Sequence, residues 1–445
     1  MRIIVGAEEG RRTVLLRRSL TEMDVPPAVR DLTRRVLGAD LSPAEAVARI
    51  IADVRAEGDA ALLHYGEAFD GTAPSSLTVS VEQRQAAFGA VDPELVAHLR
   101  FAASRIRMFH ETQLENCQTN FSRGGLGMRV RPIERIGMYA AGTAVVYPSS
   151  ILMTVIPAKV AGINEILVTT PAGPDGRVSP LKLVAADIAG VDAVFCASGA
   201  QAIAAMAYGT QTIPKVDKIC GPGNLFVTLA KQQLFGAVGI DAMYGPTETI
   251  IIADDSADAA FCAADLLAQA EHDAMARPIL LTPSLPFAKA IEQEIERQLA
   301  EVERSDVASI ALDNGGAVVT AGVEEAIDLA NEFAPEHLCL LIRDAGRWVD
   351  SVRNAGGLFV GESSPEAMGD YTAGPSHVMP TGGSARYSSP LNVLDFLKIT
   401  NVVEVDADAL RELGPAAAAI ARAEGLTAHA RAIEMRLEKR DDGAR

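Results

Sequence analysis

Between Arg131 and Asp254 the sequence alternates short apolar runs with longer helix-like stretches, and this alternation restricts the fold more than any other feature. The short runs end in Gly, Pro or Asp and read IGMYAAG, EILVTTP, AVFCASG, KICGPG and TIIIADD. The stretches between them read SILMTVIPAKVAGI, SPLKLVAADIAGV, AQAIAAMAYG and NLFVTLAKQQLFG. Repeated strand, turn and helix are typical of βαβ units, so the sequence predicts an α/β fold with a parallel sheet.

Parallel sheets of this kind bind ligands at the carboxyl ends of their strands. The residues that fall there are Tyr139, Gly199, Gln201, Gly221, Gly223 and Asn224. The segment GPGNLF, residues 221–226, has the G-x-G spacing but lacks the third glycine of a dinucleotide fingerprint. It still predicts a turn that opens a helix, and a helix N-terminus attracts phosphate.

A second α/β pattern follows, and helical segments flank the whole. PILLTPS and HLCLLIRD predict strands, PFAKAIEQEIERQLAEV and VEEAIDLANEF predict helices, and residues 361–390 form a Gly-, Ser- and Pro-rich segment of a length that is usually functional. Near the N-terminus, Ser42 and Glu45 have the spacing of a capping box, and Gly71 predicts a helix stop. NVVEVD predicts a strand, and the Ala-rich tail after it predicts a helix.

Size and composition exclude several classes of protein. The 445 residues suffice for two to four domains, and a net charge of -18 opposes binding to nucleic acid. No apolar run reaches the roughly 18 residues that a membrane span needs, and the N-terminus lacks a signal-peptide layout. The five cysteines are dispersed without a CxxC pair, which is typical of a reducing compartment. We therefore expect a cytoplasmic protein.

The segment QAEHD places polar side chains inside an apolar run. Gln269 and His272 are three residues apart, so a helix would put them on one face, where they suit two converging ligands or a solvated helix end. Four histidines of the second half lie in polar settings close in sequence to carboxylates: His272, His337, His377 and His429, with Glu336, Glu366, Asp370 and Glu424. A Gln/His/Asp/His set suits Zn²⁺, whereas the alternative is four unrelated histidines, most of them on the surface. His98 and His110 are interpreted as packing or surface residues.

Glu336 and His337 are adjacent in FAPEHL, directly before a predicted strand. Such a pair supplies an imidazole that titrates near neutral pH and a carboxylate that activates water. The alternative is a pair exposed on a loop.

These residues lie in motifs that resemble the histidinol dehydrogenase family over residues 30 to 435. The motifs are KVDKICGPGN, GPTETIIIADDSADAAFCAADLLAQAEHD, FAPEHL, SPEAMGDYTAGPSHVMPTGGSAR and EGLTAHA. The resemblance implies oxidation of L-histidinol through L-histidinaldehyde to L-histidine with two NAD+, a zinc ion that holds the substrate, and a homodimer with swapped segments.

The resemblance also implies roles for individual residues. Gln269, His272, Asp370 and His429 match the zinc ligands, with His429 supplied by the partner subunit. Glu336 and His337 match the acid/base pair. The substrate contacts would be Thr247, His377 and Glu424 together with the zinc ligands and His337, and the NAD contacts would be Tyr139, Gln201 and Asn224.

The implied architecture has two incomplete Rossmann-like parallel-sheet domains, a helical N-terminal region and an extended C-terminal tail. Residues 1–31 would form an arm. Residues 32–137 and 248–390 would form one α/β domain with the metal and acid/base residues, and residues 138–247 would form the NAD-binding domain. The tail, residues 391–445, would complete the partner's site.

Three positions depart from the family pattern, and they leave other activities open. Ala141-Gly142-Thr143 replaces Pro-Gly-Gly, Thr247 replaces Ser, and Ser376 replaces Asn. The alternatives are a sister dehydrogenase acting on another polar alcohol, a zinc hydrolase that uses metal-bound water, and an inactive zinc scaffold. Carboxylates at 366 and 424 suit a cationic amine better than a sulfonate, and Glu336 with His337 argues against the scaffold.

Overall fold

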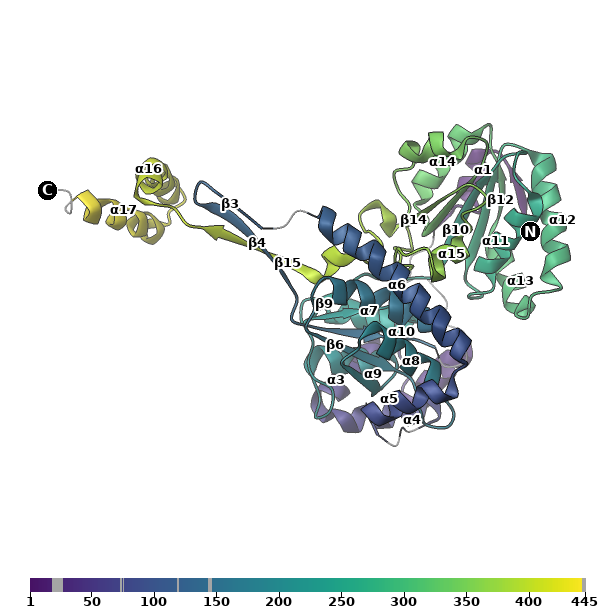
Figure 1. The fold of residues 1–445 in the computed structure, drawn as a ribbon, viewed down its shortest axis with the longest axis horizontal. Coiled ribbons are helices and arrows are strands. Elements are labelled where there is room, and N and C mark those ends of the chain that lie inside the picture. Colours follow the sequence, from purple (N-terminus) through teal and green to yellow (C-terminus); the bar gives the residue numbers. More distant parts are fainter. Residues whose placement is uncertain (18–26, 73, 75, 118–119, 143–145, 442–445) are drawn as a thin grey trace. The chain divides into compact units, whose positions relative to one another are not determined.

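Two six-stranded sheets organise most of the chain, and the computed structural model describes residues 1–17, 27–72, 74, 76–117, 120–142 and 146–441 (Figure 1). The chain divides into two units. The first comprises Met1–Glu115 and Ile133–Phe396, and the second comprises Asn116–Pro132 and Leu397–Arg445. The first unit contains both six-stranded sheets, so the expectation of a mixed α/β fold with parallel sheets is confirmed.

One sheet of the first unit, the β10 sheet, is parallel throughout and has the order β1-β12-β11-β10-β13-β14. Its strands are β1 (Ile3–Val5), β10 (Glu248–Ala253), β11 (Arg277–Thr282), β12 (Gly316–Val319), β13 (His337–Leu341) and β14 (Gly357–Val360). Its helices are α1 (Ala7–Arg12), α11 (Ala259–Ala270), α12 (Leu285–Leu299), α13 (Ser305–Asn314), α14 (Val323–Phe333) and α15 (Glu366–Tyr371), with a 3-10 helix η3 (Ala345–Ser351).

Both faces of the β10 sheet are buried, because side chains along a strand point to alternate faces. Ile251 and Cys339 pack in one apolar cluster with residues of α11, α12 and α13. Their neighbours Ile250 and Leu338 pack in a second cluster with residues of α14. Figure 1 shows helices on both sides of this sheet. This double burial explains why its strands read as continuous apolar runs.

The other sheet, the β5 sheet, has the order β2-β7-β6-β5-β8-β9. Its strands are β2 (Thr78–Val79), β5 (Arg135–Tyr139), β6 (Glu165–Thr170), β7 (Ala193–Cys196), β8 (Lys218–Cys220) and β9 (Gly239–Ile240). All neighbours pair in parallel except β2, which is antiparallel to β7. The chain runs outward from β5 to β7 and then returns to β8 on the other side of β5. The strand order therefore reverses between β5 and β8, which is where such sheets bind ligands.

Helices cover this second sheet and extend beyond it: α2 (Pro27–Leu37), α3 (Pro43–Glu57), α4 (Asp59–Asp70), α5 (Val81–Ala87), η2 (Phe88–Ala90), α6 (Pro93–Asn116), α7 (Pro148–Val160), α8 (Pro180–Ala189), α9 (Gly199–Tyr208) and α10 (Leu225–Leu234). The predicted capping box of Ser42 and Glu45 is present at the start of α3. Gly71, at φ 71°, ends α4 as expected. Gly58, at φ 59°, divides the predicted helical stretch into two helices, since a left-handed residue cannot continue a right-handed helix.

Two segments pack differently from the predicted domain grouping. Residues 1–31 are predicted to form an N-terminal arm; within them, β1 is an edge strand of the β10 sheet, with Ile3 opposite Ala317 and Val5 opposite Val319. Residues 32–137 are predicted to group with 248–390, yet α3 packs against α9 and α10, which cover the β5 sheet, and β2 pairs with β7 in that sheet. These contacts join residues far apart in sequence, so helix periodicity could not predict them.

The second unit is small. β3 (Phe121–Arg123), β4 (Leu126–Pro132) and β15 (Leu397–Val403) form an antiparallel sheet in the order β15-β4-β3, and α16 (Ala407–Ala423) packs against α17 (Thr427–Asp441). Two further 3-10 helices, η4 (Ser384–Arg386) and η5 (Val393–Phe396), precede β15 in the first unit. The buried apolar residues of the helix pair are three alanines, Ala418, Ala421 and Ala430.

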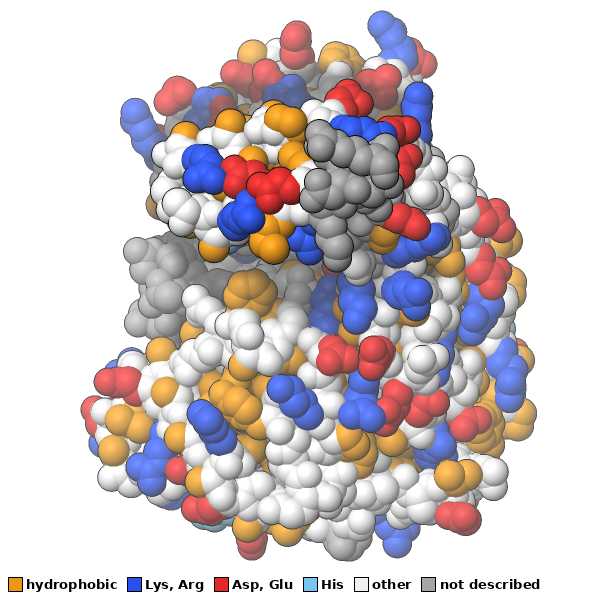
Figure 2. Space-filling model, turned by 90° about the vertical axis from the view of Figure 1, so that its left-hand side faces the viewer, with side chains coloured by type: hydrophobic (Ala, Val, Ile, Leu, Met, Phe, Trp, Pro, Cys, Tyr) orange, Lys and Arg blue, Asp and Glu red, His pale blue; other side chains and the backbone are white. Residues whose placement is uncertain are grey.

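The surface carries charges of both signs, and the cysteines are free. On the face shown in Figure 2, acidic and basic side chains are intermingled with apolar ones. All five cysteines are free, and four of them are buried. No helix in the described part of the chain is long and apolar enough to cross a membrane.

Candidate functional site

A cavity of about 640 Å³ in the first unit brings together loops of the two large sheets. On the side of the β5 sheet it is lined by Ala141 and by residues 222–226, which follow β8. From the β10 sheet and its helices it receives seven of the predicted site residues: Thr247, Gln269, His272, Glu336, His337, Asp370 and His377. Thr247 and His337 lie at the amino ends of β10 and β13. The carboxyl-end rule therefore predicts only the β5 side of this cavity.

The carboxylate of Glu336 is buried and receives hydrogen bonds from two neighbours. The Thr247 hydroxyl lies 2.6 Å from Glu336 Oε2, and the backbone N–H of Glu248 donates to the same oxygen at 3.1 Å. Thr247 Oγ1 is also 2.9 Å from Gln269 Oε1, but its single proton can serve only one acceptor at a time. Burial raises the pKa of Glu336 to about 7, although His337 and these hydrogen bonds oppose the rise. The group is therefore suited to accept a proton near neutral pH.

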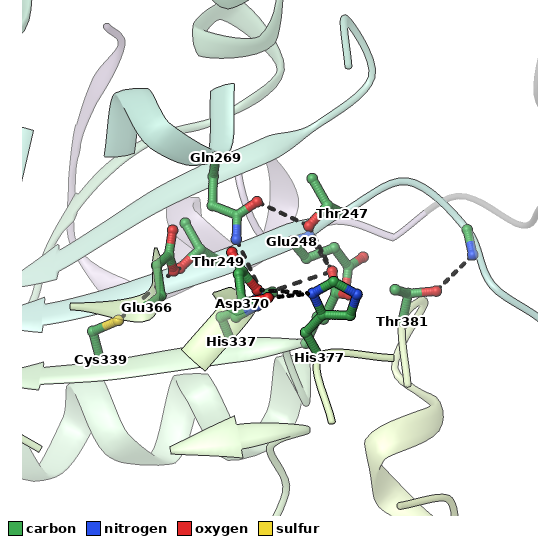
Figure 3. A network of polar contacts seen from close by, with 12 residues as sticks. Thr247, Glu248, Thr249, Gln269, His337, Cys339, Glu366, Asp370, His377 and Thr381 are labelled. Carbon is green, nitrogen blue, oxygen red and sulfur yellow. Dashed lines mark hydrogen bonds and ion pairs between the residues drawn. The ribbon is translucent and has the colours of Figure 1, made fainter. Parts of the chain in front are cut away.

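The His337 ring lies between Gln269 and Asp370 (Figure 3). Its Nδ1 is 3.1 Å from Gln269 Nε2, and its Nε2 is 3.7 Å from Asp370 Oδ1. Burial lowers the pKa of His337, but Glu336 and Asp370 raise it more, to about 10. Nε2 is buried and makes no hydrogen bond to the described residues; it faces only the Asp370 carboxylate at ion-pair distance. It is thus the ring nitrogen left to exchange a proton with a bound molecule.

Asp370 and two further histidines face the same cavity. His377 Nδ1 is 2.9 Å from the Asp370 carbonyl oxygen, which orients the ring (Figure 3). Burial lowers the pKa of His377, and desolvation also lowers the pKa of His272, so both favour the neutral form that binds metals. Burial would raise the pKa of Asp370, but the nearby charge of His337 brings it below the usual value. Its carboxylate is therefore ionised.

The donor set fits a borderline metal ion only in part within one chain. Gln269, at the end of α11, and His272, just beyond it, supply an amide oxygen and an imidazole, and Asp370 supplies a carboxylate. These are ligand types that zinc accepts. Among the described residues, no group of three or more His, Cys, Asp and Glu side chains is placed to hold a metal ion. The set would need a further donor to reach four protein ligands.

The turn between β8 and α10 forms the side of the cavity that is suited to bind a phosphate group. Gly221 has φ 105°, and a Cβ there would lie 2.4 Å from the Tyr139 carbonyl oxygen, so only glycine fits. Asn224 caps α10, its Oδ1 accepting from the Val227 N–H at 3.2 Å. The loop thus brings an exposed helix N-terminus to the cavity wall, as a phosphate site requires.

The structure does not bring every predicted residue to this cavity. Tyr139 and Gln201 are both buried, and neither is among the residues that line the cavity. The Tyr139 hydroxyl accepts from the Gly199 N–H at 3.2 Å, and burial raises its pKa to about 12. Gln201 Nε2 donates to Ser198 Oγ at 3.2 Å. Their contacts with NAD stay a prediction.

Two more predicted site residues belong to the second unit. Glu424 is the residue after α16, and His429 lies in the first turns of α17. Both side chains are exposed. Their contribution to a site stays a prediction.

The departures from the family pattern fall in different settings. Ala141 lines the cavity and Gly142 has φ 98°, whereas Thr143 lies outside the described residues. Ser376 is buried and its hydroxyl donates to the Met153 carbonyl oxygen at 3.0 Å, which is a packing role. Thr247 contributes its hydroxyl to the Glu336 network described above.

Sequence reasoning missed two residues that hold loops of the site: Thr381, which lines the cavity, and Lys231, which supports the turn at Gly221. Thr381 Oγ1 accepts from the Gly245 N–H and so ties the 361–390 segment to the loop before β10 (Figure 3). Lys231 Nζ donates to the Gly221 carbonyl oxygen at 2.9 Å and pairs with Asp241. A lysine inside the apolar stretch NLFVTLAKQQLFG was the available signal, because a buried charge requires a partner.

Comparison with known proteins gives consistent results. Residues 34–437 match the family model for histidinol dehydrogenase. A histidinol dehydrogenase of Deinococcus radiodurans is 48% identical over 443 residues, covering 98% of this chain and 100% of the relative, and one of Dehalococcoides mccartyi is 46% identical over 439 residues, with the same coverage. A crystal structure of histidinol dehydrogenase from Elizabethkingia anophelis has a TM-score of 0.89 at 35% identity and covers 99% of both chains. The similarity therefore extends over both units.

Proposed function

The chain belongs to the histidinol dehydrogenase family, and from this premise we propose that it oxidises L-histidinol to L-histidine through L-histidinaldehyde with two NAD+. One observation carries the proposal. The turn at the reversal of strand order in the β5 sheet lines the same cavity as Glu336, His337, Gln269, His272 and Asp370. A nucleotide and a polar substrate can therefore meet at an acid/base pair.

A zinc ion fits this proposal. Gln269 Oε1, His272 and Asp370 would hold it, with His429 of a second copy of the chain as the fourth ligand. When bound, the ion supplies a Lewis-acidic anchor for the imidazole and amine nitrogens of histidinol. The set contains no thiolate, so it suits zinc better than softer metal ions that prefer sulfur ligands.

His337 and Glu336 would divide the proton transfers between them. His337 would accept the substrate hydroxyl proton as hydride leaves for the nicotinamide, which requires a neutral ring. A cation held by Asp370 would lower the pKa of His337 from about 10 toward that state. Glu336 would accept a proton from the water that hydrates the aldehyde, for which its pKa of about 7 is suitable. A second hydride then leaves the hydrate. The Glu336 carboxylate is held for this role by Thr247 and by the Glu248 N–H.

NAD+ would bind across the β5 sheet at the reversal between β5 and β8. The α10 N-terminus and the Gly221–Asn224 turn would face the pyrophosphate, which removes the need for a complete glycine fingerprint. Asn224 would contact the cofactor directly. Tyr139 and Gln201 would contact it from the ends of β5 and α9.

The second unit supports a homodimer with exchanged segments. Its helix pair buries only small side chains, whereas Leu413, Ile420, Leu426 and Met435 are exposed. Apolar side chains of this size on a small unit favour burial against another surface. A second copy of the chain would provide it and would receive Glu424 and His429 at its own site.

The test is NAD+ reduction by the zinc-loaded protein with L-histidinol, with NADH counted per histidinol consumed. Two NADH per substrate would support the four-electron reaction. One would show that the second oxidation is absent or that the aldehyde escapes. No reduction by folded, zinc-loaded protein would contradict the proposal and would lead to a panel of other polar alcohols.

A further inference from the structure

Arg17, between α1 and the start of α2, contacts Glu248 at the start of β10 and the C-terminal end of α14. Its guanidinium forms a two-pronged ion pair with Glu248: Nη1 donates to Oε1, and Nη2 donates to Oε2 at 2.8 Å. The Glu248 side chain is only 6% exposed. Because a bidentate arginine–carboxylate pair fixes both groups in one plane, it defines the position of the residue after Thr247.

The same guanidinium holds the C-terminal end of α14. Nε donates to the Phe333 carbonyl oxygen at 3.0 Å, and Nη2 donates to the carbonyl oxygens of Phe333 and Ala334 at 2.6 and 3.2 Å. The guanidinium also lies 3.8 Å from the centre of the Phe333 ring. The last carbonyl groups of a helix have no partner within it, so Arg17 satisfies acceptors that would otherwise need water.

Ala334, whose carbonyl oxygen Arg17 contacts, has an unusual backbone conformation. It adopts a left-handed conformation, with φ 54° and ψ 67°, which disfavours residues that carry a Cβ. Pro335 follows it, and then come Glu336 and His337. The direction in which the chain leaves α14 toward the acid/base pair is therefore set at the residue that Arg17 holds.

Both contacts of Arg17 lead to the Glu336 carboxylate. Through Glu248 it fixes the backbone N–H that donates to Glu336 Oε2 at 3.1 Å. Through Ala334 it fixes the backbone two residues before Glu336. One side chain from the first 17 residues thus contacts both the residue whose N–H donates to this carboxylate and the backbone that leads to it.

We propose that Arg17 is a positioning residue for the acid/base pair: by clamping Glu248 to the left-handed Ala334, it sets the place of Glu336 and His337 in the cavity. The inference rests on the proposed function for the roles of Glu336 and His337. It assigns a catalytic consequence to residues 1–17, none of which lines the cavity.

The chain contains a matched control. Arg11, in α1, also binds the end of α14, where it pairs with Glu332 at 2.7 Å, but its side chain is 37% exposed and touches neither Glu248 nor Ala334. Arg17→Met and Arg11→Met each remove one arginine that ties the N-terminal segment to α14. Only the first removes the clamp.

The first measurement is steady-state kinetics on zinc-loaded protein with L-histidinol. Arg17→Met should lower kcat by on the order of ten- to a hundredfold, because small displacements of a catalytic group cost this much, while zinc content and the KM for NAD+ stay unchanged. Arg17→Lys should recover little, since an ammonium cannot bridge a carboxylate and two carbonyl groups at once. Adding Ala334→Gly to Arg17→Met should restore part of kcat, because glycine adopts the left-handed conformation without strain. Arg11→Met should retain wild-type kcat.

The second measurement does not depend on turnover. In hydrogen exchange followed by mass spectrometry, Arg17→Met should speed exchange at the amides of Glu248, Gly356 and Gly357, which donate to Glu336 Oε2, Pro335 O and Glu336 O. Arg11→Met should leave these amides unchanged. If wild-type protein fails to oxidise histidinol, the proposed function is wrong, and the exchange experiment still tests the clamp.

The outcomes separate the two ideas. A fall in kcat with faster exchange confined to these amides supports the inference. Unchanged exchange at all three amides overturns the clamp. Unchanged kcat despite faster exchange, or a fall in kcat that Arg11→Met reproduces, overturns the catalytic role of Arg17.

Discussion

Lys231 and Asp241 form an ion pair in which each side chain is only 1% exposed, with 2.5 Å between Nζ and Oδ1. The pair holds Gly221 from two directions. Lys231 Nζ donates to the Gly221 carbonyl oxygen, and the Gly221 N–H donates to Asp241 Oδ2 at 2.7 Å. The turn at the reversal of the β5 sheet is therefore fixed by charges that lie behind it and do not line the cavity.

Removing one charge of this pair should destabilise the fold, because the other charge stays buried without its partner. Lys231→Met leaves the Asp241 carboxylate buried without its cation, which should lower the free energy of unfolding by about 3–5 kcal/mol. Urea unfolding of Lys231→Met, with Arg297→Met as a control at the exposed Arg297–Glu294 pair, measures this effect. Adding Asp241→Asn, which removes the unpaired charge and keeps an acceptor for the Gly221 N–H, should recover part of the lost stability. A double variant no more stable than Lys231→Met would contradict the explanation.

Lys182 predicts a dependence of stability on pH. Its buried ammonium donates to the Gly142 carbonyl oxygen at 2.6 Å and to Thr170 Oγ1 at 2.7 Å, and burial lowers its pKa from 10.5 to about 8. Above pH 8 the folded chain releases this proton while the unfolded chain keeps it, so this lysine's contribution to stability should increase with pH. Between pH 8 and 10 the gain should be about 2 kcal/mol.

The measurement compares wild type with Lys182→Met in urea at several pH values. The difference in free energy of unfolding between the two should change across pH 8 to 10 in favour of wild type. Lys159→Met, at a lysine that pairs with Asp192, should show no such change relative to wild type. A difference that stays constant with pH would show that Lys182 keeps an ordinary affinity for its proton.

Glu336→Gln should slow the two oxidations unequally. If Glu336 activates the water that hydrates the aldehyde, its removal should slow aldehyde oxidation by about 10²–10⁴-fold and alcohol oxidation much less. In wild type, aldehyde oxidation should rise with pH through about 7, because only the ionised carboxylate accepts a proton. The variant should lose this inflection. Each substrate is supplied separately with NAD+, and equal losses in both steps would argue against this role.

The sequence predicted those parts of the fold that depend on local pattern. Ser42 and Glu45 form their capping box, and the apolar runs around Tyr139 and Cys220 are strands of one parallel sheet. It could not predict β1, because three apolar residues carry little periodicity and their partner, β12, lies more than 300 residues away. Nor could periodicity show that Gly58 breaks a helix, since its neighbours continue the helical pattern on both sides.

The sequence likewise predicted only part of the candidate site. Polar residues inside apolar runs indicated Gln269 and His272, and the structure places them with His337 and Asp370 around one cavity. Arg17 gave no signal, because an arginine in a basic stretch near a terminus looks like a solvated charge. Its role depends on the left-handed conformation of Ala334, which no local pattern encodes.

Hybrid dimers test whether His429 acts across subunits. Gln269, His272 and Asp370 lie in one unit and His429 in the other, and the three first-unit donors leave a four-ligand zinc site incomplete. His429→Ala and His272→Ala should each be inactive alone. If each site takes His429 from the partner, every mixed dimer has one intact site, so equal mixing should restore about one quarter of wild-type activity.

A matched mixture provides the control. His272→Ala combined with Gln269→Ala places both defects in the same half of the site, so every mixed dimer has two damaged sites and should stay inactive. Subunit exchange is confirmed with differently tagged chains. Recovery in the first mixture alone would establish a shared site. No recovery in either mixture, with exchange confirmed, would mean that each chain completes its own site and that the second unit serves another purpose.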